Sequence, residues 1–214
     1  MDAKATVKVG PFGRGGKSRV PTKAADHDFE PVTTLTPVGI LMPATGELFL
    51  YAVTSKVTSD CLVDRLIQWW EAVKDRSAHV ETLVINLDNG PENQSRRTQF
   101  MQRLVDFVQH YQTNIRLAYY PPYHSKYNPI ERCWGALEGH WNGSLLDSID
   151  TVIKSARSMT WKGAHPAVAL VTTVYQTGAK LTKQAMDALE TQFERLPLLD
   201  KWFVDIRYPS SSLG

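Results

Sequence analysis

The sequence predicts an α/β protein whose strands form one mixed sheet with helices on both faces. Three observations lead to this prediction. Residues 3–9 alternate between apolar and polar side chains, as a strand does. Two apolar runs, at residues 38–42 and 48–53, flank a short loop with Pro43 and Gly46, which favours an antiparallel hairpin. Strand and helix patterns then alternate, and such βα units build a sheet that helices cover.

The elements after the hairpin follow from the spacing of apolar residues. Helical spacing predicts a first helix that Thr58 or Ser59 can cap. The apolar run at residues 83–87 is typical of a buried strand, and it ends at Asp88. A second helix is expected over about 95–112, a strand over 115–119 and a third helix from Pro129. Three strands followed by alternating helices and strands is the element order of the ribonuclease-H-like fold.

We expect two regions along the chain. Residues 1–145 form the ribonuclease-H-like core, with an incomplete first strand, and residues 146–214 form a mostly helical C-terminal extension. Its helices are expected near 148–160, 166–176 and 182–195, with a short strand in 202–208. A chain of 214 residues with 43% hydrophobic content can bury such a core.

Composition excludes several classes of protein. Cys61 and Cys133 are isolated, so neither a zinc site nor a disulfide framework is indicated. No apolar run approaches the ~18 residues of a membrane span, and the first residues contain no apolar run typical of a signal peptide. We therefore expect a soluble cytoplasmic protein with no membrane partner. The net charge is only +2, but the first 23 residues carry six basic residues against the single acid Asp2. Such a cationic end could bind phosphate or could be a solvated loop.

Two acids stand where catalytic acids are expected. Asp88 follows a strand, and ligand sites in open α/β sheets lie at the carboxyl ends of strands. The alternative without a catalytic role is that Asp88 only helps to form a turn, since Asp-Asn-Gly favours left-handed backbone angles. Glu131 would be the third residue of a helix capped by Asn128, and could simply complete a capping box. Gly135, one turn further on, leaves space beside it for a ligand.

The combination of acids favours a metal site. A two-metal phosphodiesterase needs several carboxylates around ions ~3.5–4 Å apart, and Mg²⁺ prefers oxygen ligands. Asp2, on the first strand, is the third candidate, because that strand is expected beside the one ending at Asp88. The alternative for Asp2 is that it has no role as a ligand and lies in a frayed, solvated terminus. Gly16-Lys17-Ser18 is not a P-loop, because the motif requires glycine where Pro11 stands.

Two stretches of sequence resemble a known family. Asp88-Asn89-Gly90 and the later Tyr-Pro-Pro-Tyr-His-Ser-Lys-Tyr-Asn-Pro-Ile-Glu-Arg-Cys-Trp-Gly are similar to the DDE transposases of bacterial insertion sequences. The opening Asp-Ala-Lys-Ala-Thr-Val-Lys-Val-Gly-Pro-Phe-Gly-Arg-Gly-Gly-Lys-Ser-Arg resembles the Rhodopirellula-type (ISAzo-type) transposases more distinctively. The resemblance covers nearly the whole chain.

The resemblance implies a function and a set of residues. Asp2, Asp88 and Glu131 would be the three catalytic acids and would bind two Mg²⁺ or Mn²⁺ ions. The implied reaction is hydrolysis of DNA at transposon ends, followed by attack of the freed 3′-hydroxyl on target DNA, in a complex of several copies of the chain. Family members carry a DNA-recognition region and a complete first strand before the first acid, whereas only Met1 precedes Asp2. We therefore expect a truncated or split transposase.

Basic residues are secondary candidates for contacts with DNA phosphates. They are Arg14, Lys17, Arg19, Lys126 and Arg132. Two other interpretations stay open: an inactive remnant or repurposed DNA-binding module, and a stand-alone ribonuclease-H-like nuclease.

Overall fold

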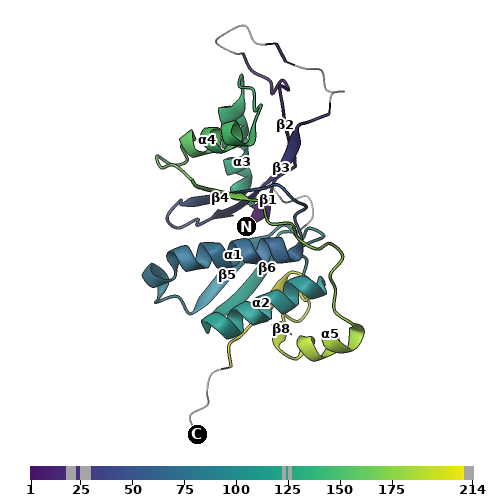
Figure 1. The fold of residues 1–214 in the computed structure, drawn as a ribbon. Coiled ribbons are helices and arrows are strands. Elements are labelled where there is room, and N and C mark those ends of the chain that lie inside the picture. The colour runs from purple at the N-terminus through teal and green to yellow at the C-terminus, as the bar shows by residue number, and fades with distance from the viewer. Residues whose placement is uncertain (18–22, 25–29, 122–123, 125–126, 210–214) are drawn as a thin grey trace. The chain divides into compact units, whose positions relative to one another are not determined.

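The computed structural model describes residues 1–17, 23–24, 30–121, 124 and 127–209. The chain divides into two compact units, each assembled from two stretches. The first unit comprises Met1–Val57 and Pro129–Val174, and the second comprises Thr58–Asn128 and Tyr175–Gly214. Each unit has its own sheet and its own helices (Figure 1). The boundary expected at residue 145 stays a prediction.

Within the described residues, the sheet of the first unit contains five strands. They are β1 (Asp2–Ala3), β2 (Val7–Val9), β3 (Thr33–Leu41), β4 (Leu48–Val53) and β7 (Ala167–Val171). The predicted hairpin is confirmed, because β3 and β4 pair antiparallel with Gly39 opposite Leu50. Both β1 and β2 pair antiparallel with β3, and β7 pairs parallel with β4. The hairpin loop turns through Gly46 at a φ of 79°, a conformation that suits glycine.

The predicted first strand is broken by one extra residue. Asp2 lies opposite Gly39, whereas Val7 lies opposite Leu35, so β3 has one residue fewer over the same interval. Such a β-bulge reverses the alternation of faces, and Asp2 becomes buried together with Val7. The extra residue is Ala5, because its neighbours keep partners on β3: Lys4 N donates to Pro37 O (2.8 Å), and the hydroxyls of Thr6 and Thr36 lie 2.9 Å apart. Ala3 and Ala5, which share one face in a regular alternation over residues 3–9, are both exposed.

Two helices cover one face of the first sheet. They are α3 (Ile130–Trp141) and α4 (Ile149–Ser158). Helix α3 has a buried apolar stripe, which packs with residues of the sheet and of α4; its members are Ile130, Cys133, Trp134, Leu137 and Trp141. Gly39 makes this approach possible, because a Cβ there would lie 2.6 Å from Trp134 Cη2 and 2.9 Å from Ile130 Cδ1. The core of this unit therefore depends on a glycine inside a strand.

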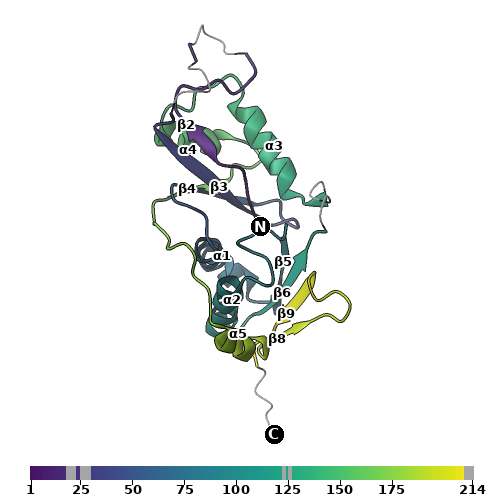
Figure 2. The same cartoon turned by 90° about the vertical axis from the view of Figure 1, so that its right-hand side faces the viewer.

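Among its described residues, the second unit has a four-stranded sheet in the order β5-β6-β9-β8. Helices α1 and α2 lie on the same face of it in both views (Figures 1 and 2). Thr58 caps α1, as one of the two predicted alternatives, by accepting a hydrogen bond from Cys61 N at 3.3 Å. The elements are α1 (Ser59–Val73), η1 (Asp75–Ser77), β5 (Thr82–Leu87), α2 (Thr98–Tyr111), β6 (Asn114–Tyr119), α5 (Lys183–Glu190), β8 (Phe193–Arg195) and β9 (Phe203–Ile206).

Three expectations need correction. The strands form two sheets rather than one, and among the described residues β1 pairs with β3 while β5 pairs with β6. The opposite face of the second sheet exposes Val84, so β5 alternates in burial instead of being buried throughout. The helix expected over 166–176 is wrong, because residues 167–171 form β7. Valine-rich runs of this length suit a strand as well as a helix, and pairing with β4 decides the outcome.

The short strand near the C-terminus is confirmed as β9. In the part of the chain that the structure describes, no helix has the length and apolarity needed to span a membrane.

Candidate active site

Asp2 is held in the first unit by a tryptophan from α3. Its side chain is buried, with 5% of the residue exposed. Trp134 Nε1 donates a hydrogen bond to Asp2 Oδ2 at 2.7 Å. Burial of a carboxylate requires such donors, because an ion loses its hydration there. Asp2 is therefore a fixed residue of the core edge and not a frayed terminal residue.

Glu131 lies at the start of the same helix. It is exposed, and it is the second residue of α3 rather than the third. The prediction that Asn128 caps this helix is wrong: Pro129, with helical angles of −63° and −22°, is the capping residue and has no side-chain donor or acceptor. Asn128 is instead buried. As expected, Gly135 leaves open space, with no heavy atom within 4 Å of a Cβ built there.

The helix α3 links two of the three predicted acids. It carries Glu131 and, three residues later, the Trp134 that holds Asp2. Residues at this spacing are neighbours on a helix surface, with Cβ atoms roughly 5–6 Å apart. The sequence did not single out Trp134 for this role, because its place in the apolar stripe of α3 explains it equally well.

Asp88 begins the loop after β5 in the second unit. Its Oδ1 accepts hydrogen bonds from Gly90 N at 3.2 Å and from Asn93 Nδ2 at 2.8 Å. Asn89 has a φ of 63°, so the turn chemistry considered for this motif is present. Gly90 has a second role, because a Cβ there would lie 3.3 Å from Oδ1 and 3.4 Å from Oδ2 of Asp88. The loop therefore leaves the carboxylate room on the side of Gly90.

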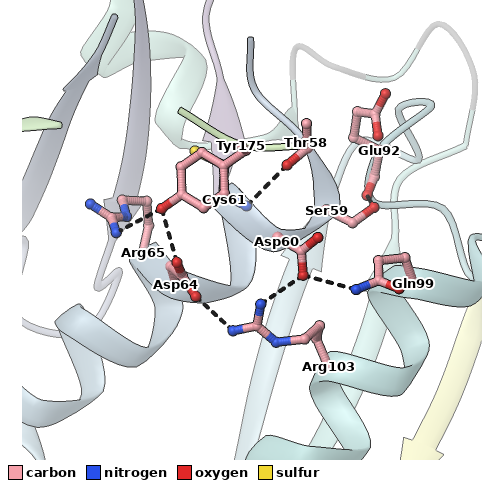
Figure 3. Close-up of polar contacts among 10 residues, drawn as sticks. All are labelled: Thr58, Ser59, Asp60, Cys61, Asp64, Arg65, Glu92, Gln99, Arg103 and Tyr175. Atoms are coloured by element: carbon pink, nitrogen blue, oxygen red, sulfur yellow. Dashed lines mark hydrogen bonds and ion pairs between the residues drawn. The ribbon is translucent and has the colours of Figure 1, made fainter. Parts of the chain in front are cut away.

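The loop that carries Asp88 is anchored through its backbone carbonyls. Asn93, which the sequence analysis missed, is buried, and its Oδ1 has no hydrogen-bond donor among the described residues. The hydroxyl of Tyr119 is one of the groups that anchor this loop. Burial is the main cause that raises the pKa of Tyr119, and the nearby Asp88 raises it further. Three side chains of the second unit donate to the loop: Tyr119 Oη to Asn93 O (2.7 Å), Arg195 Nη2 to Ser95 O (2.8 Å) and Ser59 Oγ to Glu92 O (2.8 Å; Figure 3).

Figure 3 also shows a polar network between α1 and α2. Arg103 of α2 bonds Asp60 at 2.7 Å and Asp64 at 2.6 Å, both on α1. The hydroxyl of Tyr175 donates to Asp64 Oδ2 at 2.9 Å and accepts from Arg65 Nη2 at 3.2 Å. Burial first, and then the bond to Asp64, raise the pKa of Tyr175 to about 12. Asp60 and Asp64 bind side chains that hold α1 and α2 together, so we assign these two acids no catalytic role.

The predicted acids have the chemistry of magnesium ligands. Asp2 and Glu131 belong to the first unit and Asp88 to the second. Within the described residues, no three side chains of Asp, Glu, His or Cys gather into a metal site. Each of the three acids supplies carboxylate oxygens, the donors that Mg²⁺ prefers. The open space at Gly135 and the absence of a side chain at Gly90, where a Cβ would lie 3.3 Å from Asp88 Oδ1, also fit a ligand at these positions.

The predicted DNA-binding residues fall into three groups. Arg14 lies over the ring of Trp141, with 5.8 Å between its Cζ and the ring centroid, and lines a cavity. Lys17 and Arg132 are exposed. Arg19 and Lys126 lie outside the described residues. The same cavity contains Lys4 and Lys8, which the sequence showed only as part of a basic terminus.

Comparison with known families agrees with these features. Residues 1–208 match the model of the family described as Rhodopirellula transposase DDE domain. The chain is therefore a DDE transposase domain. Within that class, it belongs to the family described as Rhodopirellula transposase DDE domain. Searches of curated proteins and of solved structures found no match.

Proposed function

We propose that this chain is the catalytic domain of a transposase that cleaves DNA at transposon ends and joins them to target DNA. Asp2, Asp88 and Glu131 are the proposed catalytic acids. The observation that carries the proposal is the link through α3, in which the helix bearing Glu131 also holds the buried Asp2 through Trp134. Asp2, which is buried on a strand, and Glu131, which is exposed on a helix, are thus both attached to α3. This arrangement favours binding of a shared ion over a role of these acids in solubility alone.

The three acids would hold two Mg²⁺ or Mn²⁺ ions. When bound, such ions activate water and stabilise the leaving oxygen of a phosphodiester. The protein's own part is to fix the carboxylates: Trp134 orients Asp2, and Gly90 with Asn93 orients Asp88. The proposal requires Asp88 of the second unit to approach the other two acids.

Cleavage of plasmid DNA tests the function. Supercoiled plasmids with and without the terminal repeats that flank the gene are incubated with the full chain and Mg²⁺ or Mn²⁺. We expect metal-dependent nicking only at the repeats, and none with Asp88→Asn. Equal cutting of both plasmids would favour a stand-alone nuclease. DNA binding without cutting would favour an inactive or repurposed module, and cleavage that survives Asp88→Asn would remove that residue from the site.

The spatial requirement has a separate test. Fe²⁺ replaces Mg²⁺ in many oxygen-ligand sites, and with peroxide it cuts the polypeptide near the ion. We expect cuts close to residues 2, 88 and 131, which Mg²⁺ suppresses by competition. Cuts near residues 2 and 131 without any near 88 would show that Asp88 does not share the site. The matched control is Asp147, an exposed acid of the first unit outside the proposed set, and Asp147→Asn should leave the pattern unchanged.

A further inference from the structure

Arg195 of β8 reaches from the C-terminal part of the second unit to the loop that carries Asp88. Its Nη2 donates a hydrogen bond to Ser95 O at 2.8 Å, although the two residues lie 100 positions apart in the chain. Ser95 is buried, and the side chain of Arg195 is only 19% exposed. A hydrogen bond from a charged donor is roughly twice as strong as a neutral one, and burial protects it from screening by salt.

The guanidinium of Arg195 has a defined orientation. Its Nη2 and Nε donate to the two carboxylate oxygens of Glu190 at 2.8 and 3.1 Å, and its Nη1 donates to Asp200 O at 3.2 Å. Its Cζ lies 5.1 Å from the centroid of the Phe193 ring. Glu190 is the last residue of α5, so a helix and a strand together orient the group. A planar guanidinium bound in this way holds a carbonyl at a defined position.

A short stretch of the loop connects Ser95 to Asp88. Two residues before Ser95, the side chain of Asn93 donates through Nδ2 to Asp88 Oδ1 at 2.8 Å. The carbonyl of the same Asn93 accepts from Tyr119 Oη at 2.7 Å. Burial is the main influence on the pKa of Tyr119 and raises it, while Arg195 lowers it and Asp88 raises it. Both charges therefore lie within electrostatic reach of this hydroxyl, one on each side of the loop's anchoring.

We propose that Arg195 is a positioning residue for the reaction, which keeps the loop of Asp88 in the conformation that presents this carboxylate to the metal ions. The inference rests on the proposed function for the role of Asp88. A metal ligand must be held within ~0.5 Å of its productive position, and loops need added support to do so. The alternative is that Arg195 only joins α5 to β8. The ion pair with Glu190 would suffice for that, yet the same Nη2 also donates to Ser95 O.

Hydrogen–deuterium exchange of the full chain in EDTA tests the hold on the loop without catalysis. Within residues 88–97, the amides of Asn93 and Gln94 donate to Gly90 O and report on the conformation of the loop. Arg195→Gln removes the charged donor, so local opening of the loop should become easier. We expect amides in this peptide to exchange about tenfold faster, while peptides from β6 exchange as in the native chain.

The matched control is Arg207→Gln. Arg207 forms ion pairs with Glu194 at 3.1 Å and with Asp205 at 3.7 Å, so this variant also removes an arginine from the same sheet. Exchange in residues 88–97 should stay native in this control. Arg195→Lys keeps a cation but lacks the planar fork, so its exchange should be intermediate. Equal exchange of the loop in Arg195→Gln and Arg207→Gln would overturn the proposal; if Arg195→Gln fails to fold by circular dichroism, Arg195→Lys decides by the same comparison.

Cleavage at increasing Mg²⁺ concentration separates positioning from a purely structural role. A loosened Asp88 binds metal more weakly, so Arg195→Gln should need several-fold more Mg²⁺ for half-maximal cleavage, and Arg195→Lys should recover part of the difference. Faster exchange of the loop with a native Mg²⁺ requirement would also overturn the proposal. If the native chain does not cleave, or if cleavage survives Asp88→Asn, the proposed function fails, and exchange alone then decides whether Arg195 fixes the loop.

Discussion

Replacing Gly39 by alanine tests the packing that holds Asp2. An alanine Cβ at this position would lie 2.6 Å from Trp134 Cη2 and 2.9 Å from Ile130 Cδ1. Neither side chain has space to retreat, because Trp134 is 4% and Ile130 1% exposed. Overpacking a filled core costs about 1–3 kcal/mol. The lower chain entropy of alanine offsets about 0.5–1 kcal/mol of that cost. We expect a net destabilisation of about 1–2 kcal/mol.

Thermal unfolding measures this effect. For a chain of this size, 1 kcal/mol corresponds to roughly 2–4 °C in Tm. Gly39→Ala should therefore lower Tm by about 2–8 °C. Gly139→Ala is the matched control, because Gly139 lies in α3 with no heavy atom within 4 Å of a built Cβ. Alanine is the better helix former there by about 0.5–1 kcal/mol, so this variant should raise Tm.

A second measurement connects the packing to Asp2. The indole N–H of Trp134, which donates to Asp2, gives its own resonance in ¹⁵N-labelled protein, and Trp134→Phe assigns it. This resonance should move in Gly39→Ala and stay in place in Gly139→Ala. A Gly39→Ala variant that melts at or above the native temperature, with the resonance unchanged, would refute the idea that glycine is required beneath Trp134.

Three further predictions concern the second unit. Gly90→Ala should reduce cleavage more than stability, because its Cβ would crowd both oxygens of Asp88 at 3.3 and 3.4 Å; equal activity at equal metal concentration would contradict this. Arg103→Met should destabilise the chain by about 1–2 kcal/mol in urea unfolding, since it leaves two α1 carboxylates without their shared partner; an unchanged midpoint would show that the network contributes nothing. The hydrogen bond from Arg116 lowers the pKa of Asp205 in the folded state. The resulting stabilisation is present above the unfolded pKa near 4 and is lost as the pH falls through the lower folded value, so Asp205→Asn should lose less stability than the native chain between pH 5 and 2.

Local patterns in the sequence predicted most of the elements. The hairpin, α1 with its cap at Thr58, and β5 and β6 all follow from periodicity and turn residues. The error at β7 has a different origin: residues 167–171 are apolar enough for either state, and the parallel neighbour β4 lies more than a hundred residues earlier in the chain. Whether such a segment becomes a strand or a helix depends on its pairing with a distant strand, and a short stretch of sequence carries no information about that pairing.

The placement of Asp2 shows why a site is harder to predict than its residues. Strict alternation over residues 3–9 would turn Asp2 away from Val7, toward the opposite face of the sheet. The single extra residue Ala5 reverses that relation and buries Asp2 beneath α3, where Trp134 can reach it. No residue in the stretch marks the bulge, because alanine is compatible with regular and bulged strands alike. The bulge follows from the pairing partners on β3, so the environment of Asp2 depends on the register of a strand some thirty residues away and not on its own neighbours.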